Sequence, residues 1–157
     1  MSQPNELYSL LIPLHDERLL VPRICIAEVI AFAETPQKPD GEHPPWYVGD
    51  VEWNNRRIPV VSLDQGEHKP NPKRRSRRRV VVFHGLTDHL KGRYYGLLTQ
   101  GFPQLVRVNK DVLSLDPEYV QDADRPILCR VRMIHEFPLI PDFDALEQMI
   151  AAQSVAA

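Results

Sequence analysis

The sequence predicts an all-β fold made of two small barrels, with a short helix at the C-terminus. Short runs rich in branched and aromatic residues recur along the chain with polar or proline breaks between them, which is typical of strands. The chain contains 15 prolines, scattered from Pro4 to Pro141, and proline is excluded from helix interiors. A charged loop separates two groups of strands of similar size, which indicates two lobes rather than one sandwich.

Seven segments have the composition of strands. In the clearest of them, apolar residues occupy every second position from Ile127 to Met133, so we expect one face of the strand to be buried and the other to be largely exposed to solvent. The run from Val80 to Phe83 is apolar throughout, which suits a strand covered on both sides. The predicted strands are 8–14, 18–21, 57–63, 79–83, 94–99, 105–108 and 127–133.

A helical signal follows the second predicted strand. Pro22 suits the first position of a helix, and Ile26, Val29 and Ile30 follow it at the i, i+3, i+4 spacing. This spacing predicts a short helix or turn over these residues.

A second helical signal lies at the C-terminus. Asp144 followed by Glu147 matches a capping box, which marks the start of a helix. The apolar stripe of this helix consists of Leu146, Met149 and Ile150. We expect the last residues, 153–157, to fray.

Two loops rich in proline or charge, 35–45 and 65–78, divide the strands into groups. We therefore expect one domain over residues 6–150. Its predicted parts are a first lobe of about 6–66 together with the C-terminal segment, a basic loop at 67–78, and a second lobe of about 79–135.

The basic run at 69–79 holds seven Lys and Arg residues and no acidic residue. The other 12 Lys and Arg residues face 21 Asp and Glu residues, so the rest of the chain is strongly negative. The run could bind nucleic acid, anionic lipid or an acidic protein surface, or it could be a solvated linker that its charges keep extended. No aromatic residue is interleaved for base stacking, which favours a linker or a contact with an acidic protein partner.

The sequence shows no signal for export or for a catalytic centre. The N-terminus has no basic region before its apolar run, and no apolar stretch approaches the roughly 20 residues that span a bilayer, so we expect a cytoplasmic protein. Cys25 and Cys129 are too few for a disulfide framework or a cysteine-rich zinc site, and we expect both to pack as small hydrophobic residues. No phosphate-binding, nucleophile or zinc-protease motif is present, which predicts a protein without enzymatic activity or cofactor.

A few dispersed polar residues offer weak alternatives, a metal site or a catalytic carboxylate pair, to the prediction of a non-enzymatic protein. His84 and His89 are close enough in sequence to meet across a hairpin, but two ligands do not make a metal site. Asp64 could pair with Asp142 or Asp144 as catalytic carboxylates, although an Asp just after a strand more often caps a turn or helix.

Glu28 and Glu52 are better candidates for a functional role. Both lie in otherwise apolar stretches, where a carboxylate needs a partner if it is partly buried. That partner could belong to another protein, or it could be Arg56 or Arg57 in an internal salt bridge.

Residues 46–64 resemble the most recognisable stretch of the CheW-like family. In that family a proline-marked loop leads to a Gly, then to a hairpin usually ending in Leu-Arg-Gly, and then to a Pro-Val strand that closes on Leu-Asp. Here Gly49, Pro59-Val60 and Leu63-Asp64 stand at the corresponding positions. The likeness continues over nearly all of residues 6–150, at 11–14, 18–22, 26–30, 78–83, 95–98 and 142–146.

The resemblance implies two five-stranded barrels of the SH3-like type. It also implies a non-catalytic adaptor that binds the regulatory domain of a CheA-like histidine kinase and the cytoplasmic tip of methyl-accepting receptors. The partner-binding residues that it implies are Ile26, Glu28, Gly49, Val51, Glu52, Trp53 and Asn54. We hypothesise that Trp53 is the anchor, since large aromatic residues dominate interface energies; the alternative is that Trp46 and Trp53 belong to the core.

Two departures from the family pattern suggest a divergent member. Asn54-Asn55 stands where the family commonly has Arg-Gly, and 99–101 lacks the acidic residue that usually follows the second lobe's Gly-Leu strand. These changes resemble the adaptors of pilus-type chemosensory systems rather than those of flagellar arrays. The alternative class of function is a small β-barrel that binds nucleic acid through 69–79.

Overall fold

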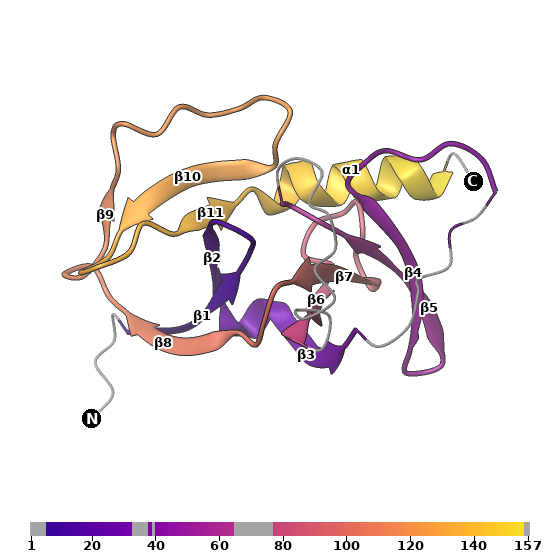
Figure 1. The fold of residues 1–157 in the computed structure, drawn as a ribbon, viewed down its shortest axis with the longest axis horizontal. Helices are drawn as coiled ribbons and strands as arrows, with labels where there is room; N and C mark the ends of the chain where they lie inside the picture. Colours follow the sequence, from indigo (N-terminus) through magenta and orange to yellow (C-terminus); the bar gives the residue numbers. More distant parts are fainter. Residues whose placement is uncertain (1–5, 33–37, 39, 65–76, 156–157) are drawn as a thin grey trace.

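The computed structural model describes residues 6–32, 38, 40–64 and 77–155. In this part of the chain, two curled sheets pack against each other, and one α-helix, which leads from β11 toward β4 in Figure 1, packs on the core that they share. The predicted class, an all-β protein of two SH3-like lobes with a short C-terminal helix, is confirmed.

The first sheet contains strands from both ends of the chain. Its strand order is β8-β1-β2-β11-β10-β9, six strands where five were predicted, and β11 runs parallel to β2. Apolar residues on its inner face form the core of the first lobe, with Leu11, Leu20, Val108 and Val131 fully buried. The strands are β1 (Leu7–Pro13), β2 (Arg18–Pro22), β8 (Gln104–Val108), β9 (Ser114–Leu115), β10 (Ile127–Arg132) and β11 (Leu139–Pro141).

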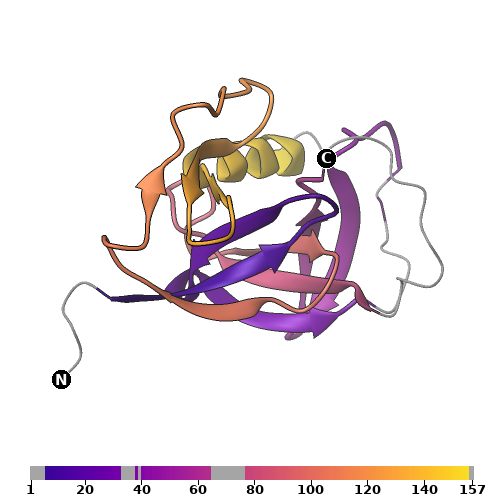
Figure 2. The ribbon, with the colours of Figure 1, turned by 60° about the vertical axis from the view of Figure 1, so that its left-hand side comes forward.

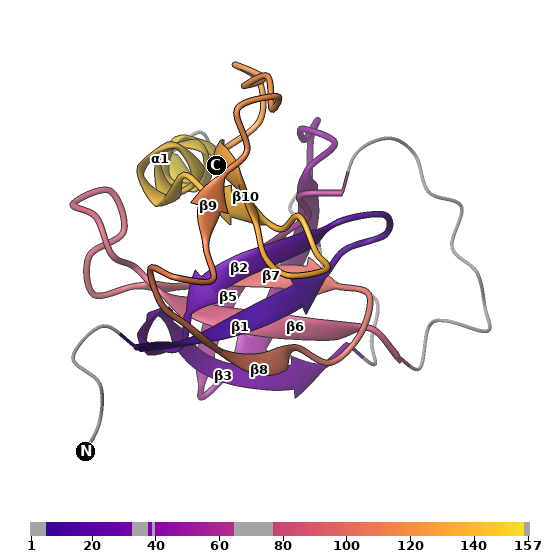
Figure 3. The same cartoon turned by 90° about the vertical axis from the view of Figure 1, so that its left-hand side faces the viewer.

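The second sheet is formed by the middle of the chain. Its five strands follow the order β3-β6-β7-β5-β4, and its lobe has a core of its own around Ile58, Val60 and Val82. In Figure 3, which looks along the long axis, strands of the first sheet lie in front of the second. The strands are β3 (Ile26–Ala31), β4 (Tyr47–Trp53), β5 (Arg56–Val61), β6 (Arg79–His84) and β7 (Tyr94–Thr99).

A third and larger core lies between the sheets and the helix α1 (Phe143–Val155) (Figure 2). The apolar run in β6 contributes to two cores, because Val80 and Val82 face the second lobe's core while Val81 and Phe83 face the central one. This strand is covered on both sides, as the continuous apolar run predicts. Leu146 and Ile150 join the central core from α1.

Of the short helix or turn predicted over residues 22–30, the structure has only a turn, and a strand replaces the rest. Only Arg23–Cys25 form a single 3₁₀ turn, and β3 begins at Ile26. A β-bulge between Ile26 and Glu28 inserts one residue into the strand, so Ile26 and Val29 face one core while Ala27 and Ile30 face the other. The bulge therefore reproduces helical spacing within a strand.

The C-terminal helix is present, but the predicted capping box is wrong. Asp142 is the capping residue, since its Oδ1 accepts a hydrogen bond from Ala145 N at 3.1 Å. Glu147 points into the protein instead, and α1 continues to Val155, past the expected start of fraying. No helix within the described residues is both long enough and apolar enough to span a bilayer.

The sheets divide the chain differently from the predicted lobes. Strands β5 and β6 flank the basic loop, yet both belong to the second sheet, so the loop is not a boundary between lobes. The prediction for the cysteines is confirmed: Cys25 packs in the central core and Cys129 against the first lobe's core. Burial raises the pKa of both thiols.

Candidate partner-binding site

A side-chain hydrogen bond joins the two edge strands of the second sheet. Trp53, the last residue of β4, donates from Nε1 to Oε2 of Glu28 on β3 at 2.6 Å. Edge strands β3 and β4 stand at opposite ends of the strand order, so this bond spans the seam where the curled sheet closes. Glu28 is exposed at this seam, and Trp53 is half-buried.

The Trp53 ring contacts both the lobe core and the half-buried ring of Tyr94. It packs against the apolar residues of the second lobe, and its centroid lies 4.9 Å from that of Tyr94. The Arg56 guanidinium lies over the Tyr94 ring at 5.1 Å, in the geometry of a cation–π contact. Part of the Trp53 ring therefore belongs to the lobe core and the rest lies at the surface, where its role as an anchor stays a prediction.

The turn between β4 and β5 is built from two residues in the left-handed region. Asn54 has φ 52° and Asn55 has φ 61°, and Trp53 and Arg56 face each other across this turn. A two-residue hairpin turn of this kind requires positive φ at both positions, which Asn tolerates well. Asn54-Asn55 thus closes a two-residue hairpin, and the turn places Arg56 beside Tyr94.

The other predicted partner-binding residues lie at different depths. Glu52 and Asn54 are exposed beside the seam, and Val51 packs half-buried against the lobe core. Gly49 is buried at a β-bulge with φ 139°, where a side chain would be strained. Ile26 packs against the central core, so the structure does not bring Ile26 or Gly49 onto the exposed surface around Trp53.

The charges near the seam include one ion pair and one carboxylate bonded to Trp53, while Glu52 lies opposite Arg57 in the β4–β5 register, so an internal salt bridge for Glu52 stays a prediction. Arg57 pairs with Asp50 at 3.3 Å, while Glu28 takes its hydrogen bond from Trp53. Asp50 also accepts a hydrogen bond from the hydroxyl of Tyr47. Burial, and then this bond, raise the pKa of Tyr47.

The sequence did not single out Tyr94 as part of this site. Its contact with Trp53 depends on β7 lying next to β5 in a parallel pairing between strands far apart in sequence. The periodic pattern marks 94–99 as a strand but carries no information on its neighbour.

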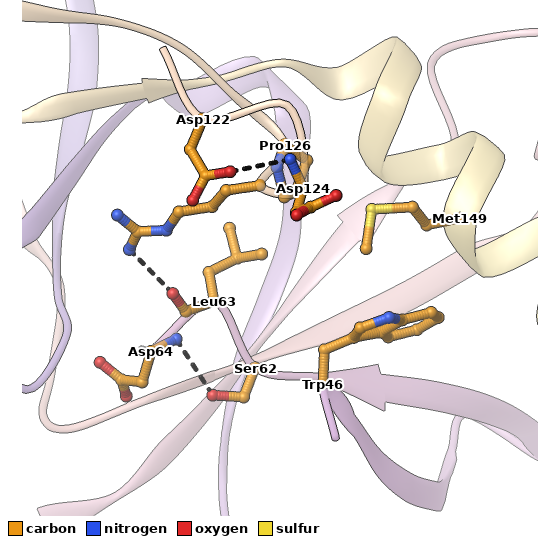
Figure 4. A pocket seen from close by; sticks show the side chains of 9 residues that line it. Trp46, Ser62, Leu63, Asp64, Asp122, Asp124, Pro126 and Met149 are labelled. Atoms are coloured by element: carbon orange, nitrogen blue, oxygen red, sulfur yellow. Dashed lines mark hydrogen bonds between the residues drawn. The ribbon is translucent and has the colours of Figure 1, made fainter. Parts of the chain in front are cut away.

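A separate hollow of about 180 Å³ lies between residues 122–126, the end of β5 and α1 (Figure 4). Trp46 and Met149 form its apolar walls. Its polar groups bond to one another: Asp124 N donates to Asp122 at 2.9 Å, and Arg125 donates to the Leu63 carbonyl at 2.9 Å. These hydrogen bonds thus stabilise the local turns that surround the hollow.

The suggested carboxylate pair and histidine pair have other partners. Asp64 accepts hydrogen bonds from His15 N at 2.7 Å and Gln100 Nε2 at 3.0 Å, while Asp142 caps α1. His84 lies against Tyr94, whereas His89 approaches Asp144 at 3.5 Å, so the two histidines do not meet. Among the described residues, no three His, Cys, Asp or Glu side chains are grouped to hold a metal ion.

Most of the basic run, 69–76, lies outside the described residues. Of its last three members, Arg77 is exposed, and the Arg79 guanidinium lies 5.4 Å from the centroid of the exposed Phe102 ring.

Comparison with known proteins agrees with this architecture. The family model described as a CheW-like domain matches residues 9–149. The crystal structure of the scaffolding protein TtCheW from Thermoanaerobacter tengcongensis superposes with a TM-score of 0.66 at 14% sequence identity, covering 88% of this chain and 86% of that one. No curated protein sequence matches the chain. The match over nearly the whole chain and the two-lobed fold together show that this protein belongs to the CheW-like domain family.

Proposed function

We propose that this protein is a non-catalytic chemosensory adaptor that couples methyl-accepting receptors to a CheA-like histidine kinase. The observation that carries the proposal is the CheW-like family match over residues 9–149. An adaptor needs firm lobes with exposed contact surfaces and no reacting group. The comparisons favour this function over the nucleic-acid alternative.

The regulatory domain of the kinase and the receptor tip are the proposed partners. Both lie in the cytoplasm in chemosensory systems of this family, and we propose that the adaptor acts there. The Asn54-Asn55 turn in place of the family's usual Arg-Gly supports a place in a pilus-type system that drives twitching motility.

The surface around the Trp53–Glu28 bond is the proposed contact for the receptor tip. Glu28, Glu52 and Asn54 are exposed around the half-buried Trp53 ring, which gives an aromatic centre with a polar rim. Val51 supports the ring from the lobe core, and Gly49 shapes the strand that carries it.

A pull-down of the kinase's regulatory domain, at low and high salt, tests the proposed function. Binding that survives high salt is expected, because an apolar interface is screened little by ions. Failure to bind the kinase domain, together with salt-sensitive retention of nucleic acid, would contradict the adaptor function and point to the basic run.

Replacing Trp53 tests the receptor contact. Trp53→Ala is expected to abolish receptor pull-down while the circular dichroism spectrum stays intact; loss of that spectrum would place the ring's main role in the core. Phe102→Ala is the matched control, because Phe102 is an exposed aromatic residue outside this surface, and it should bind like the parent protein.

Trp53→Phe separates the two roles of the ring. It keeps an aromatic ring against Tyr94 and the lobe core but removes the Nε1 donor to Glu28. A folded Trp53→Phe protein with weakened receptor binding supports the contact surface. Full binding by this variant together with an unfolded Trp53→Ala protein contradicts it.

A further inference from the structure

A cleft of about 290 Å³ opens beside the Trp53 surface, between β5 and the turn that precedes β7. Three arginines line it: Arg56 and Arg57 from β5, and Arg93 from the turn. Pro59 and Tyr94 contribute apolar surface between them. We refer to it as the arginine cleft.

The arginine cleft carries more positive than negative charge. Arg57 is paired with Asp50 at 3.3 Å. Among the residues that the structure describes, no carboxylate lies within the 4.0 Å of an ion pair from Arg56 or Arg93. Two guanidinium groups on opposite sides of the cleft are therefore available to an anionic ligand.

Contacts within the protein position the Arg56 guanidinium and the backbone of Arg93. Arg56 rests over the Tyr94 ring at 5.1 Å. Arg93 is fixed through its backbone, since its N–H donates to Leu90 O at 2.9 Å and its carbonyl accepts from Gly85 N at 2.8 Å. Leu90 is only 3% exposed and anchors the turn, so the backbone that carries Arg93 needs no further ordering when a ligand binds.

The chemistry of the cleft favours carboxylates carried by a peptide. Guanidinium groups bind carboxylate and phosphate in planar, two-bond geometry. Nucleic acid also needs an open aromatic face for its bases, but Tyr94 is already in contact with Trp53, His84 and Arg56. The apolar surface between the arginines suits the methylene groups of Glu side chains.

We propose that the arginine cleft binds side-chain carboxylates of an acidic segment in a partner protein. This inference goes beyond the proposed function, because it holds whichever protein supplies the segment. The test below uses a synthetic peptide, so its outcome does not depend on the kinase or the receptor.

The first test is titration of the whole protein, labelled with ¹⁵N, with a short peptide of alternating Glu and Ala at low salt. The side-chain Nε–Hε signals of Arg56 and Arg93 are expected to shift saturably, and the same peptide with Gln in place of Glu should leave them unchanged. Shifts confined to residues 69–79 overturn the proposal. A stronger response of the same two signals to inorganic phosphate also overturns it, because the ligand is then a phosphate.

Substitutions test whether these particular arginines are used. Arg56→Gln and Arg93→Gln are each expected to weaken peptide binding about threefold, as for partly exposed charge pairs, and the double variant about tenfold. Arg107→Gln is the matched control, because it removes one exposed arginine from β8 on the other sheet, and binding should not change. Equal weakening by all three single variants means that only net charge matters, which contradicts a specific cleft.

Discussion

Glu147 links the C-terminal helix to the loop that forms one wall of the arginine cleft. Its side chain is fully buried, and it accepts hydrogen bonds from the backbone of Leu86 and Thr87 and from the Thr87 hydroxyl at 2.9–3.0 Å. A buried carboxylate is tolerated when its oxygens are satisfied in this way. Burial, and then the Glu147 charge, raise the pKa of the neighbouring Tyr95 hydroxyl.

Replacing Glu147 with Gln should destabilise the protein by about 1.5–3 kcal/mol, the usual net value of hydrogen bonds to a charged group. The amide also turns a donor toward groups that themselves donate. The measurement is the free energy of unfolding in urea. Gln148→Ala, at an exposed neighbour on α1, is the control and should change stability by less than about 0.5 kcal/mol. A similar small change for Glu147→Gln would show that the loop does not depend on this contact.

Asp116 should make stability depend on pH in the acidic range. The Glu118 backbone N–H, and then Arg130, lower the pKa of its carboxyl group, with a further contribution from Arg132. The Asp116 carboxyl group therefore binds a proton more tightly in the unfolded chain than in the folded protein. Its contribution to the free energy of unfolding is fully present above about pH 4 and is lost as pH falls through the lowered pKa. Urea midpoints measured from pH 6 downward should fall less steeply for Asp116→Asn than for the parent. Parallel curves for the two proteins would exclude this contribution.

Among the elements, the β4–β5 hairpin carries the most exposed part of the candidate site. Its two-residue turn needs positive φ at both positions, and Asn54-Asn55 supplies it. Asn55→Gly should maintain or raise stability, because Gly adopts positive φ without steric cost. Asn55→Ala should lower the free energy of unfolding by about 1–2 kcal/mol, because its Cβ clashes in the left-handed region. Equal stability of the two variants in urea would show that the turn relaxes to another conformation.

Elements with a simple alternating or continuous apolar pattern could be predicted from the sequence. The seven predicted strands are all present, because each is long enough to show an alternating or a continuous apolar pattern. Strands β9 and β11, of two and three residues, are too short to show any period. β3 was assigned wrongly because its bulge gives Ile26 and Val29 helical spacing.

The candidate site was predictable as separate residues but not as an arrangement. The sequence identifies Glu28 and Trp53 individually, but it does not predict that they are in contact. That contact depends on how far the five-stranded sheet curls. Arg56 and Arg93 come together only because β5 lies beside β7. Such parallel pairings are determined by tertiary packing, which the local hydrophobic pattern of the sequence does not predict.

For the whole molecule, the central core makes the two lobes depend on each other. Each sheet has a core of its own, yet Ile12 and Leu19 from the first sheet, Val81 and Leu97 from the second, and Leu146 from α1 share a third. Neither sheet can separate without exposing this shared surface to water. We therefore expect the protein to unfold as one unit rather than lobe by lobe.

Native-state hydrogen exchange on two cavity variants tests this expectation. Leu11→Ala removes a side chain from the first lobe's own core, and Ile58→Ala does the same in the second, each at a cost of about 2–5 kcal/mol. If the lobes unfold together, either variant lowers the protection of the slowest-exchanging amides in both sheets by the same free energy. Loss confined to the sheet that carries the substitution would show that the lobes open independently, and a partner could then bind one lobe while the other is unfolded.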